Sequence, residues 1–412
     1  MRTFLPSCIL VCCFLISTSI NAQLQKIYLH PKAAGNAKQT QFVDSIRFIP
    51  LEAKKGIQVS TNSNVQITED YFFLNDYSEK KIFLFSKGGA FIKEVNYKHL
   101  GTSFYPSYNQ HTNQIVLFGN NKNYTLTPTD QIKIRMDWDK PGNRKYFRKY
   151  VVDLMDSSFA IQKSIPNQLD IISAYHFYED YYWQAQIITS PLYEDSADYE
   201  VKIYRDNKLA GAFFPYNRVT EPRFLYTQET SAFHKTDTPS VNMVTRPYCD
   251  TIYKMVKDSL YPACQLVTPL ENSLPASFFT KSFKNKTERE NFNRNNGWMF
   301  HQVYDFYETP QFIFLLVAYL SNYESYIYQK GTNVTYKTKN IKADTSQYNL
   351  QLLTEFNLIR RGDWFYKSHT AGELLTFFEK NKNVPIPEEL ESFLKSNPPS
   401  TARVIVQFKL KS

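Results

Sequence analysis

The chain has 412 residues, enough for two or three average domains or one large closed one, so length alone does not settle the domain count. Aromatic residues make up 16% of the chain, with 30 Tyr and 32 Phe, and this composition favours many short strands buried on both faces over a helical protein. The formal net charge of +9 favours anionic surfaces or ligands, although a charge spread over a large surface serves solubility equally well.

The first 22 residues have the features of a secretory signal peptide. Arg2 supplies the positive end, Ile9–Ile16 the apolar stretch, and Ala22 a cleavage point before Gln23. The apolar stretch is shorter than the ~20 residues of a membrane-spanning helix, so we expect no transmembrane span. We predict an exported protein, periplasmic or extracellular, with a single mature domain over residues 23–412. Removal of Arg2 leaves a formal charge of +9 − 1 = +8.

The cysteines bear on lipid anchoring and on disulfide formation. Cys8 lies too early for a lipidation site and Cys12 does not follow small residues, so a lipoprotein anchor is the weaker alternative. Cys249 and Cys264 flank a predicted hairpin, and an exported protein lies where disulfides persist. A disulfide between them and two separate buried thiols are both open, because the expected turn places Cys249 diagonally from Cys264, a geometry that disulfides tolerate poorly.

Residues 64–97 predict one complete four-stranded sheet. The expected strands are separated by turns rich in Asn, Asp, Ser, Lys and Gly, and they are Val65–Thr68, Tyr71–Leu74, Ile82–Phe85 and Phe91–Val95. The middle two are apolar on both sides, unlike the strands of a sheet with one wet face. Each sheet of a β-propeller is packed between two neighbouring sheets, and that architecture covers both faces.

Similar groups of short strands follow along the chain. We predict further blades over 105–137, 171–217, 224–268 and 299–342, and a last one over 352–410 together with 45–51. Blade two is expected to contain strands at 114–119, 124–127 and 132–136, and blade four to begin with a strand at 224–226. Helical patterns interrupt them at 275–296, after Thr370, where the spacing is that of a capping box, and from Pro387 onward. Ser45–Leu51 and Arg403–Leu410 lack partners nearby, so we expect them to share the last blade and close the ring.

The fold class predicted is therefore all-β: a six-bladed β-propeller with small helical insertions. Short motifs support it, namely Phe48–Glu52, Phe85–Ile92, Asp250–Tyr253 and Asn397-Pro398 before the final strand. The chain thus resembles the six-bladed β-propeller family of exported Gram-negative bacterial proteins. This resemblance implies the fold and an envelope location; many members look like lipoproteins, and the family carries no settled activity.

Candidate ligand-binding residues come from a repeat in two inner strands. Ala174-Tyr175-His176-Phe177-Tyr178-Glu179 recurs as Val303-Tyr304-Asp305-Phe306-Tyr307-Glu308. We expect His176 and Asp305 to face a common central channel, with Glu179 and Glu308 at the ends of their strands. Such groups could hold a divalent metal in the channel, although surface positions with ordinary hydrogen bonds explain them as well.

No other signature of catalysis stands out. The sequence lacks G-x-S-x-G, H-E-x-x-H, C-x-x-C, G-x-G-x-x-G and the P-loop, so it offers no catalytic set and no cofactor site. Residues 139–150 mix Lys and Arg with Tyr and Phe, as nucleic-acid sites do. In an exported protein such a segment is better explained as a solvated loop, and we expect no nucleic acid partner.

These observations favour an exported, monomeric module of the cell envelope that binds a glycan, a peptide or an envelope protein, or serves as a scaffold. The alternative is a metal-assisted lyase or hydrolase that uses the central channel.

Overall fold

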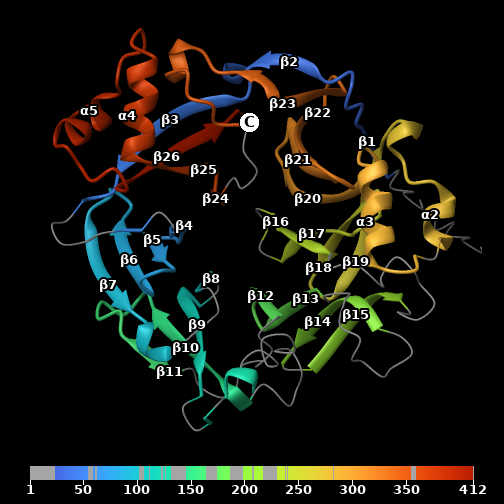
Figure 1. Cartoon of the computed structure of the whole chain (residues 1–412), viewed down its shortest axis with the longest axis horizontal. Helices are drawn as coiled ribbons and strands as arrows, with labels where there is room; N and C mark the ends of the chain where they lie inside the picture. Colours follow the sequence, from blue (N-terminus) through green and yellow to red (C-terminus); the bar gives the residue numbers. More distant parts are fainter. Residues whose placement is uncertain are drawn as a thin grey trace, which may run out of the picture.

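The computed structural model describes residues 24–53, 59–60, 63–101, 106–110, 112–121, 124–125, 127–130, 145–163, 174–185, 198–206, 208–216, 230–236, 238, 240–281, 283–353 and 359–411. Within them, six sheets stand around a centre as blades (Figure 1). The predicted six-bladed β-propeller is confirmed. The predicted signal peptide lies outside the described residues. No helix in the described ranges is long and apolar enough to cross a membrane.

Blade one contains β4 (Ser63–Ile67), β5 (Tyr71–Asp76), β6 (Lys81–Ser86) and β7 (Phe91–Asn96). Its two central strands are buried on both faces, as the apolar runs predict. Phe73 and Leu84 pack with side chains of blade two, whereas Phe72 and Phe83 pack against Tyr366 and other side chains of blade six. Shelter by two neighbouring sheets is thus the reason that these strands carry no polar face.

Blade two differs from its prediction. It contains β8 (Ser107–Asn109), β9 (Gln114–Asn120), β10 (Phe147–Asp153) and β11 (Ile161–Lys163). The expected strand at 124–127 is wrong, since the described residues there form no strand, and the expected strand at 132–136 lies outside the described residues. The partner of β9 is instead β10, whose first residues fall in the segment predicted to be a solvated loop. Val151 and Val152 are buried and hold this strand in the sheet.

Blades three to five follow in chain order. Blade three contains β12 (Ala174–Tyr178), β13 (Tyr181–Ala185), β14 (Asp198–Arg205) and β15 (Lys208–Tyr216). Blade four contains β16 (Ala232–Lys235), β17 (Val241–Thr245), β18 (Thr251–Val256) and β19 (Ser259–Val267). Blade five contains β20 (Phe300–Glu308), β21 (Phe312–Tyr319), β22 (Tyr323–Gln329) and β23 (Val334–Lys342).

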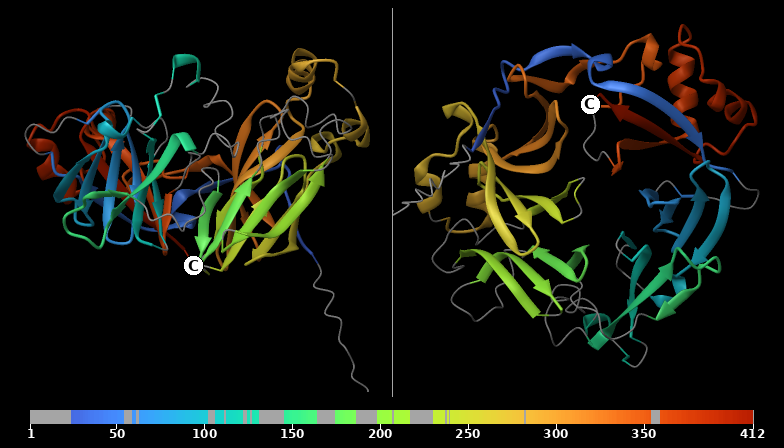
Figure 2. Two further views of the ribbon diagram at one scale, coloured as in Figure 1. Left: turned by 90° about the horizontal axis from the view of Figure 1, so that it is seen from below. Right: turned by 180° about the vertical axis from the view of Figure 1, so that it is seen from behind.

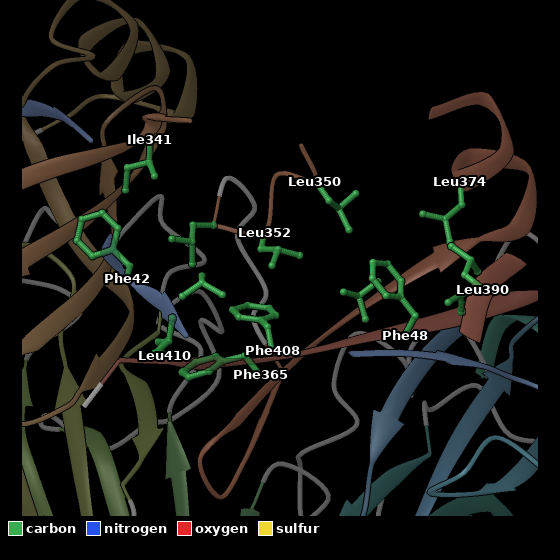
Figure 3. Close-up of a cluster of buried hydrophobic side chains, with 14 of the residues drawn as sticks. Phe42, Phe48, Ile341, Leu350, Leu352, Phe365, Leu374, Leu390, Phe408 and Leu410 are labelled. Atoms are coloured by element: carbon green, nitrogen blue, oxygen red, sulfur yellow. The ribbon is translucent and has the colours of Figure 1, made fainter. Parts of the chain in front are cut away.

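Blade six joins the two ends of the chain. It contains β24 (Ile359–Arg361), β25 (Trp364–Thr370), β26 (Arg403–Leu410) and, beside β26, the early strand β3 (Val43–Pro50). The two end strands are antiparallel, with Val406 opposite Phe48. Figure 3 shows Phe48, Phe365 and Phe408 in the core beneath them. The predicted closure of the ring is confirmed.

The segment before β3 adds a feature that the sequence did not indicate. β1 (Gln25–Tyr28) pairs in parallel with the last strand of blade four, and β2 (Gly35–Lys38) pairs in parallel with the last strand of blade five. Figure 2 shows this blue segment along the outside of the ring. It covers the outer edges of two blades before entering a third, and covered edges resist pairing with other chains.

The helices lie outside the ring (Figure 1). α2 (Ala276–Thr280) and α3 (Lys286–Asn295) form the insertion between blades four and five. α4 (Ala371–Lys380) begins with the predicted capping box of Thr370 and Glu373, and α5 (Glu388–Lys395) follows it within blade six. Short 3-10 turns lie at Gln39–Gln41, Lys98–Leu100, Leu270–Asn272 and Thr345–Gln347.

Candidate functional site

A cavity of about 580 Å³ lies at the centre of the ring. The right-hand view of Figure 2 shows the ring from behind. Its lining comes from five of the six blades: Glu69 after β4, Gln110 after β8, His176 on β12, Lys235 on β16 and Arg361 on β24. These residues lie on or directly after the innermost strand of each blade. We call this cavity the central cavity.

A second cavity of about 250 Å³, the aromatic cavity, adjoins the first one. It lies between blades four, five and six, and Lys235 and Arg360 line both cavities. Aromatic rings form much of its wall: Phe233, Phe306, Tyr307, Phe314 and Phe365. Apolar walls with a few charged groups at the opening are typical of ligand sites.

A third cavity of about 640 Å³ lies between blades one and six and shares Glu69 and Arg361 with the central cavity. Lys87 lies in its wall, donates a hydrogen bond of 2.7 Å to the carbonyl of Thr68, and stands over the ring of Phe72. Burial, with the nearby charge of Arg361, lowers the pKa of Lys87 to about 8.

Lys235 is one of two cations, with Arg360, that line both the central and the aromatic cavity. Its side chain is exposed to the solvent of these cavities. Desolvation by the surrounding side chains, with repulsion from Arg361, lowers the pKa of Lys235 to about 8. No carboxylate of the described residues lies within ion-pair distance of its ammonium group, and its Nζ makes no hydrogen bond there.

Arg361 is held in place by contacts to two other blades. Its Nε donates a hydrogen bond of 2.8 Å to the carbonyl of Ile67, and its Nη1 donates to Oε1 of Gln110. The guanidinium lies 4.8 Å from the centre of the Tyr108 ring. Burial lowers the pKa of Arg361. A fixed guanidinium with donors left over on Nη2 is suited to recognising a planar or tetrahedral oxyanion.

The predicted site residues occupy different places. His176 and Glu179 both line the central cavity, where a ring nitrogen of His176 contacts the backbone carbonyl of Glu179. Asp305 lines the aromatic cavity instead, 3.7 Å from Nδ1 of His234. Glu308 lines none of the three cavities and forms an ion pair of 2.5 Å with Lys330. In the described part of the chain, no three His, Cys, Asp or Glu side chains are grouped so that they could hold a metal ion.

The disulfide considered between Cys249 and Cys264 is not formed, and both residues are free thiols. In the register of blade four Cys264 lies opposite Ile252, so Cys249 precedes the paired part of the hairpin. Cys249 lies 4.0 Å from the hydroxyl of Tyr253. Cys264 is buried in the apolar core, and this burial raises the pKa of its thiol to about 12.

Sequence reasoning missed three cations of the site, Lys235, Arg360 and Arg361. One signal for Lys235 was present, because Ala232-Phe233-His234-Lys235 repeats the pattern of Ala174-Tyr175-His176-Phe177 in the preceding blade. The expected first strand of blade four at 224–226, which lies outside the described residues, concealed it. The two arginines lie within the blade predicted over 352–410, but no signal in the sequence marked them as cavity residues.

Fold and site together define a six-bladed β-propeller with a charged cavity at its centre. A family model described as a 6-bladed beta-propeller, DUF5128, matches residues 18–112. A solved structure from Bacteroides fragilis NCTC 9343, described as a "Putative exported protein", is similar with a TM-score of 0.59 at 13% identity, over 94% of this chain and 100% of that one.

A member of the DUF4221 family from Bacteroides vulgatus has a TM-score of 0.43 at 10% identity, over 91% of this chain and 100% of that one. No curated protein matches the chain. At 13% identity, the likeness to the Bacteroides fragilis structure supports the fold alone, and function has to be argued from the site.

Proposed function

We propose that the protein is an exported binding module of the cell envelope, with its ligand site in the central cavity. The observation that carries this proposal is the convergence of polar and charged side chains from five blades on a cavity of about 580 Å³. Ligand sites in proteins are commonly concave and of a few hundred Å³. A glycan fragment, a peptide end or a segment of an envelope protein would each fit that description.

Export is part of this proposal and rests on the predicted signal peptide. The mature chain is expected to begin at Gln23 and to carry no lipid. Mass spectrometry of the protein recovered from its native envelope gives the mass of the N-terminal peptide. A peptide that retains Arg2, or one with the added mass of acyl chains, would contradict this expectation.

Binding in the cavity can be tested with a substitution that fills it. Glu69 is exposed where the central and third cavities meet. A glycan array and a peptide library are screened with the mature protein, and binding of each hit is measured by calorimetry. We expect Glu69→Trp to abolish binding, because the indole would occupy the cavity entrance.

Glu69→Gln is the matched control, since it removes the same charge without adding bulk. Binding that survives in the Gln variant and is lost in the Trp variant supports the location of the site. The proposal fails if the protein binds no glycan, no peptide and no component of an envelope extract. It also fails if the Trp variant binds its ligands as tightly as the wild type does.

The alternative, a metal-assisted lyase or hydrolase, has weaker support in the geometry. The repeat residues His176 and Asp305, expected to share one channel, line different cavities. Metal analysis of the purified protein decides the matter: a stoichiometric divalent ion that is lost in His176→Ala would favour the enzyme over the binding module.

A further inference from the structure

Resting on the proposed function, we infer a chemical class for the ligand: Lys235, Arg360 and Arg361 bind an oxyanion at the junction of the central and aromatic cavities. The oxyanion is a carboxylate, sulfate or phosphate group of the ligand. An apolar or ring-shaped part attached to it would enter the aromatic cavity.

The first argument is the gathering of like charges. Lys235 comes from blade four and the two arginines from blade six, so the fold brings cations together that are distant in sequence. Like charges around one cavity repel each other and cost stability unless an anion lies between them. A bound oxyanion supplies that missing charge.

The second argument concerns the acids that face the same space. Glu69 and Glu179 line the central cavity, and Asp305 lines the aromatic one. Asp305 is the partner of His234, and among the described residues none of the three pairs with Lys235 or Arg361 within 4.0 Å. Among the described residues, Lys235 therefore has no carboxylate that neutralises its charge.

The third argument is that the structure gives Lys235 no role in stability. Arg361 fastens β24 to blades one and two, so its contacts explain its presence. Lys235 makes no such contact in the described part of the chain, and its side chain lines the central and aromatic cavities. An unpaired cation that is partly desolvated costs free energy, and recognition of an anion accounts for that cost.

The fourth argument is the wall beside the cations. Arg360 lies over the ring of Tyr307, with 4.0 Å between the guanidinium carbon and the ring centre. Tyr307 in turn packs edge-on against Phe365 and stacks with Phe314. This packing orients Arg360 at the entrance of the aromatic cavity, next to surfaces on which a sugar or aromatic ring can lie.

The test measures binding of four probes to the mature protein by calorimetry. Trigalacturonic acid carries carboxylates and a sulfated chondroitin disaccharide carries sulfate. Inorganic phosphate is an oxyanion without an attached ring, and maltotriose is the neutral match for trigalacturonic acid. We expect at least one anionic probe to bind, maltotriose not to bind, and the affinity to fall as salt rises above about 150 mM.

Lys235→Met is the decisive variant, because it keeps most of the side-chain volume and removes the charge. We expect it to weaken anion binding about tenfold or more, as the loss of one charge-assisted contact does. Lys208→Met, on the exposed first residue of β15, is the matched control and should bind as the wild type does. Circular dichroism and thermal unfolding verify that both variants are folded.

The outcomes separate this inference from the proposed function. If a neutral ligand from the screen binds, is blocked by Glu69→Trp, and no anionic probe binds, the oxyanion site is wrong and the binding module stands. Unchanged anion affinity in folded Lys235→Met also overturns the oxyanion site. If nothing binds, both proposals fall.

Discussion

Arg246 of blade four and Glu200 of blade three form a buried ion pair with two hydrogen bonds, 2.8 Å from Nε to Oε2 and 2.7 Å from Nη2 to Oε1. The Glu200 side chain is only 2% exposed and the Arg246 side chain 16%. Burial alone would lower the pKa of Arg246, but the hydrogen bonds and charge of Glu200 outweigh it and raise that pKa. The pair therefore joins two neighbouring blades below the surface.

We expect Arg246→Met to destabilise the protein by about 3–5 kcal/mol, because it leaves the buried Glu200 carboxylate without its charged partner and, in the described structure, with only the hydroxyl of Ser231 beside it, at 3.4 Å. The measurement is urea unfolding at neutral pH. The double variant Arg246→Met with Glu200→Leu should recover much of the loss, since no unpaired charge remains. Glu271→Gln is the control: it breaks the exposed ion pair with Lys32 and should cost less than about 1 kcal/mol. Equal losses in the single and double variants would contradict this explanation.

Gly89 is expected to be irreplaceable in the turn between β6 and β7. It has φ +90°, a conformation that favours glycine, and an added Cβ would overlap the carbonyl oxygen of Pro50 at the end of β3. Gly89→Ala should therefore cost about 2–4 kcal/mol in unfolding free energy. Gly88→Ala is the control, because its Cβ would meet only Oγ of Ser86 at 3.7 Å. A Gly89→Ala variant as stable as the control would refute the packing argument.

The fold was predictable where burial on both faces leaves a mark in the sequence. β5 and β6 are apolar on both sides because the neighbouring blades cover them. The two end strands, β3 and β26, had no other predicted partner and were therefore expected to pair with each other. β10 was missed because its first residues, Phe147, Arg148 and Lys149, mix an aromatic ring with two charges, and because many residues separate it from β9 in the sequence. The pairing of β1 and β2 with the edges of blades four and five was not predicted, because four-residue strands on a sheet edge depend on backbone pairing, which leaves no pattern in the sequence.

The site was less predictable than the fold. Channel-lining residues lie on the shortest, most polar strands, such as β16 and β24, where no apolar periodicity marks the strand. The repeat of Tyr-Asp-Phe-Tyr-Glu in blade five was real, but of its two expected ligand residues Asp305 lines the aromatic cavity and Glu308 lines none of the three cavities. Which residues meet at the centre depends on the order of the blades around the ring, and that order is a tertiary property.

Arg289 should act as the anchor of the helical insertion. It is 2% exposed on α3, and its Nη2 donates a hydrogen bond of 2.5 Å to the hydroxyl of Tyr248 next to β17. The rings of Tyr248, Phe278 and Phe283 surround its guanidinium at 4.8–5.1 Å. Arg289→Ala would leave a cavity among these rings, so we expect faster hydrogen exchange in α2 and α3 and a loss of about 2–4 kcal/mol.

Arg289→Met separates the volume of this side chain from its charge. Nε and Nη1 of Arg289 have no hydrogen-bond partner in the described structure, so an apolar side chain of similar length should cost less than alanine. Arg294→Ala, exposed on the same helix, should leave exchange in α2 unchanged. If the methionine variant loses as much protection as the alanine variant, the charge and not the packing anchors the insertion.

Lys235 should make stability depend on pH in a way that its methionine variant does not. Its pKa is about 8 in the folded chain, against 10.5 for an ordinary lysine, so between these values the unfolded chain binds more protons. Stability therefore rises with pH across this window, and the cost of the charged ammonium is fully present below about pH 8. We expect Lys235→Met to be more stable than the wild type at about pH 7, with the advantage shrinking toward about pH 10.

The charged groups that face Lys235 are Glu69, Glu179, Asp305, Arg360 and Arg361, with His176 and His234. They are common to both proteins, so the difference between two urea titrations isolates Lys235; a difference that does not change with pH would show that its ammonium is fully solvated.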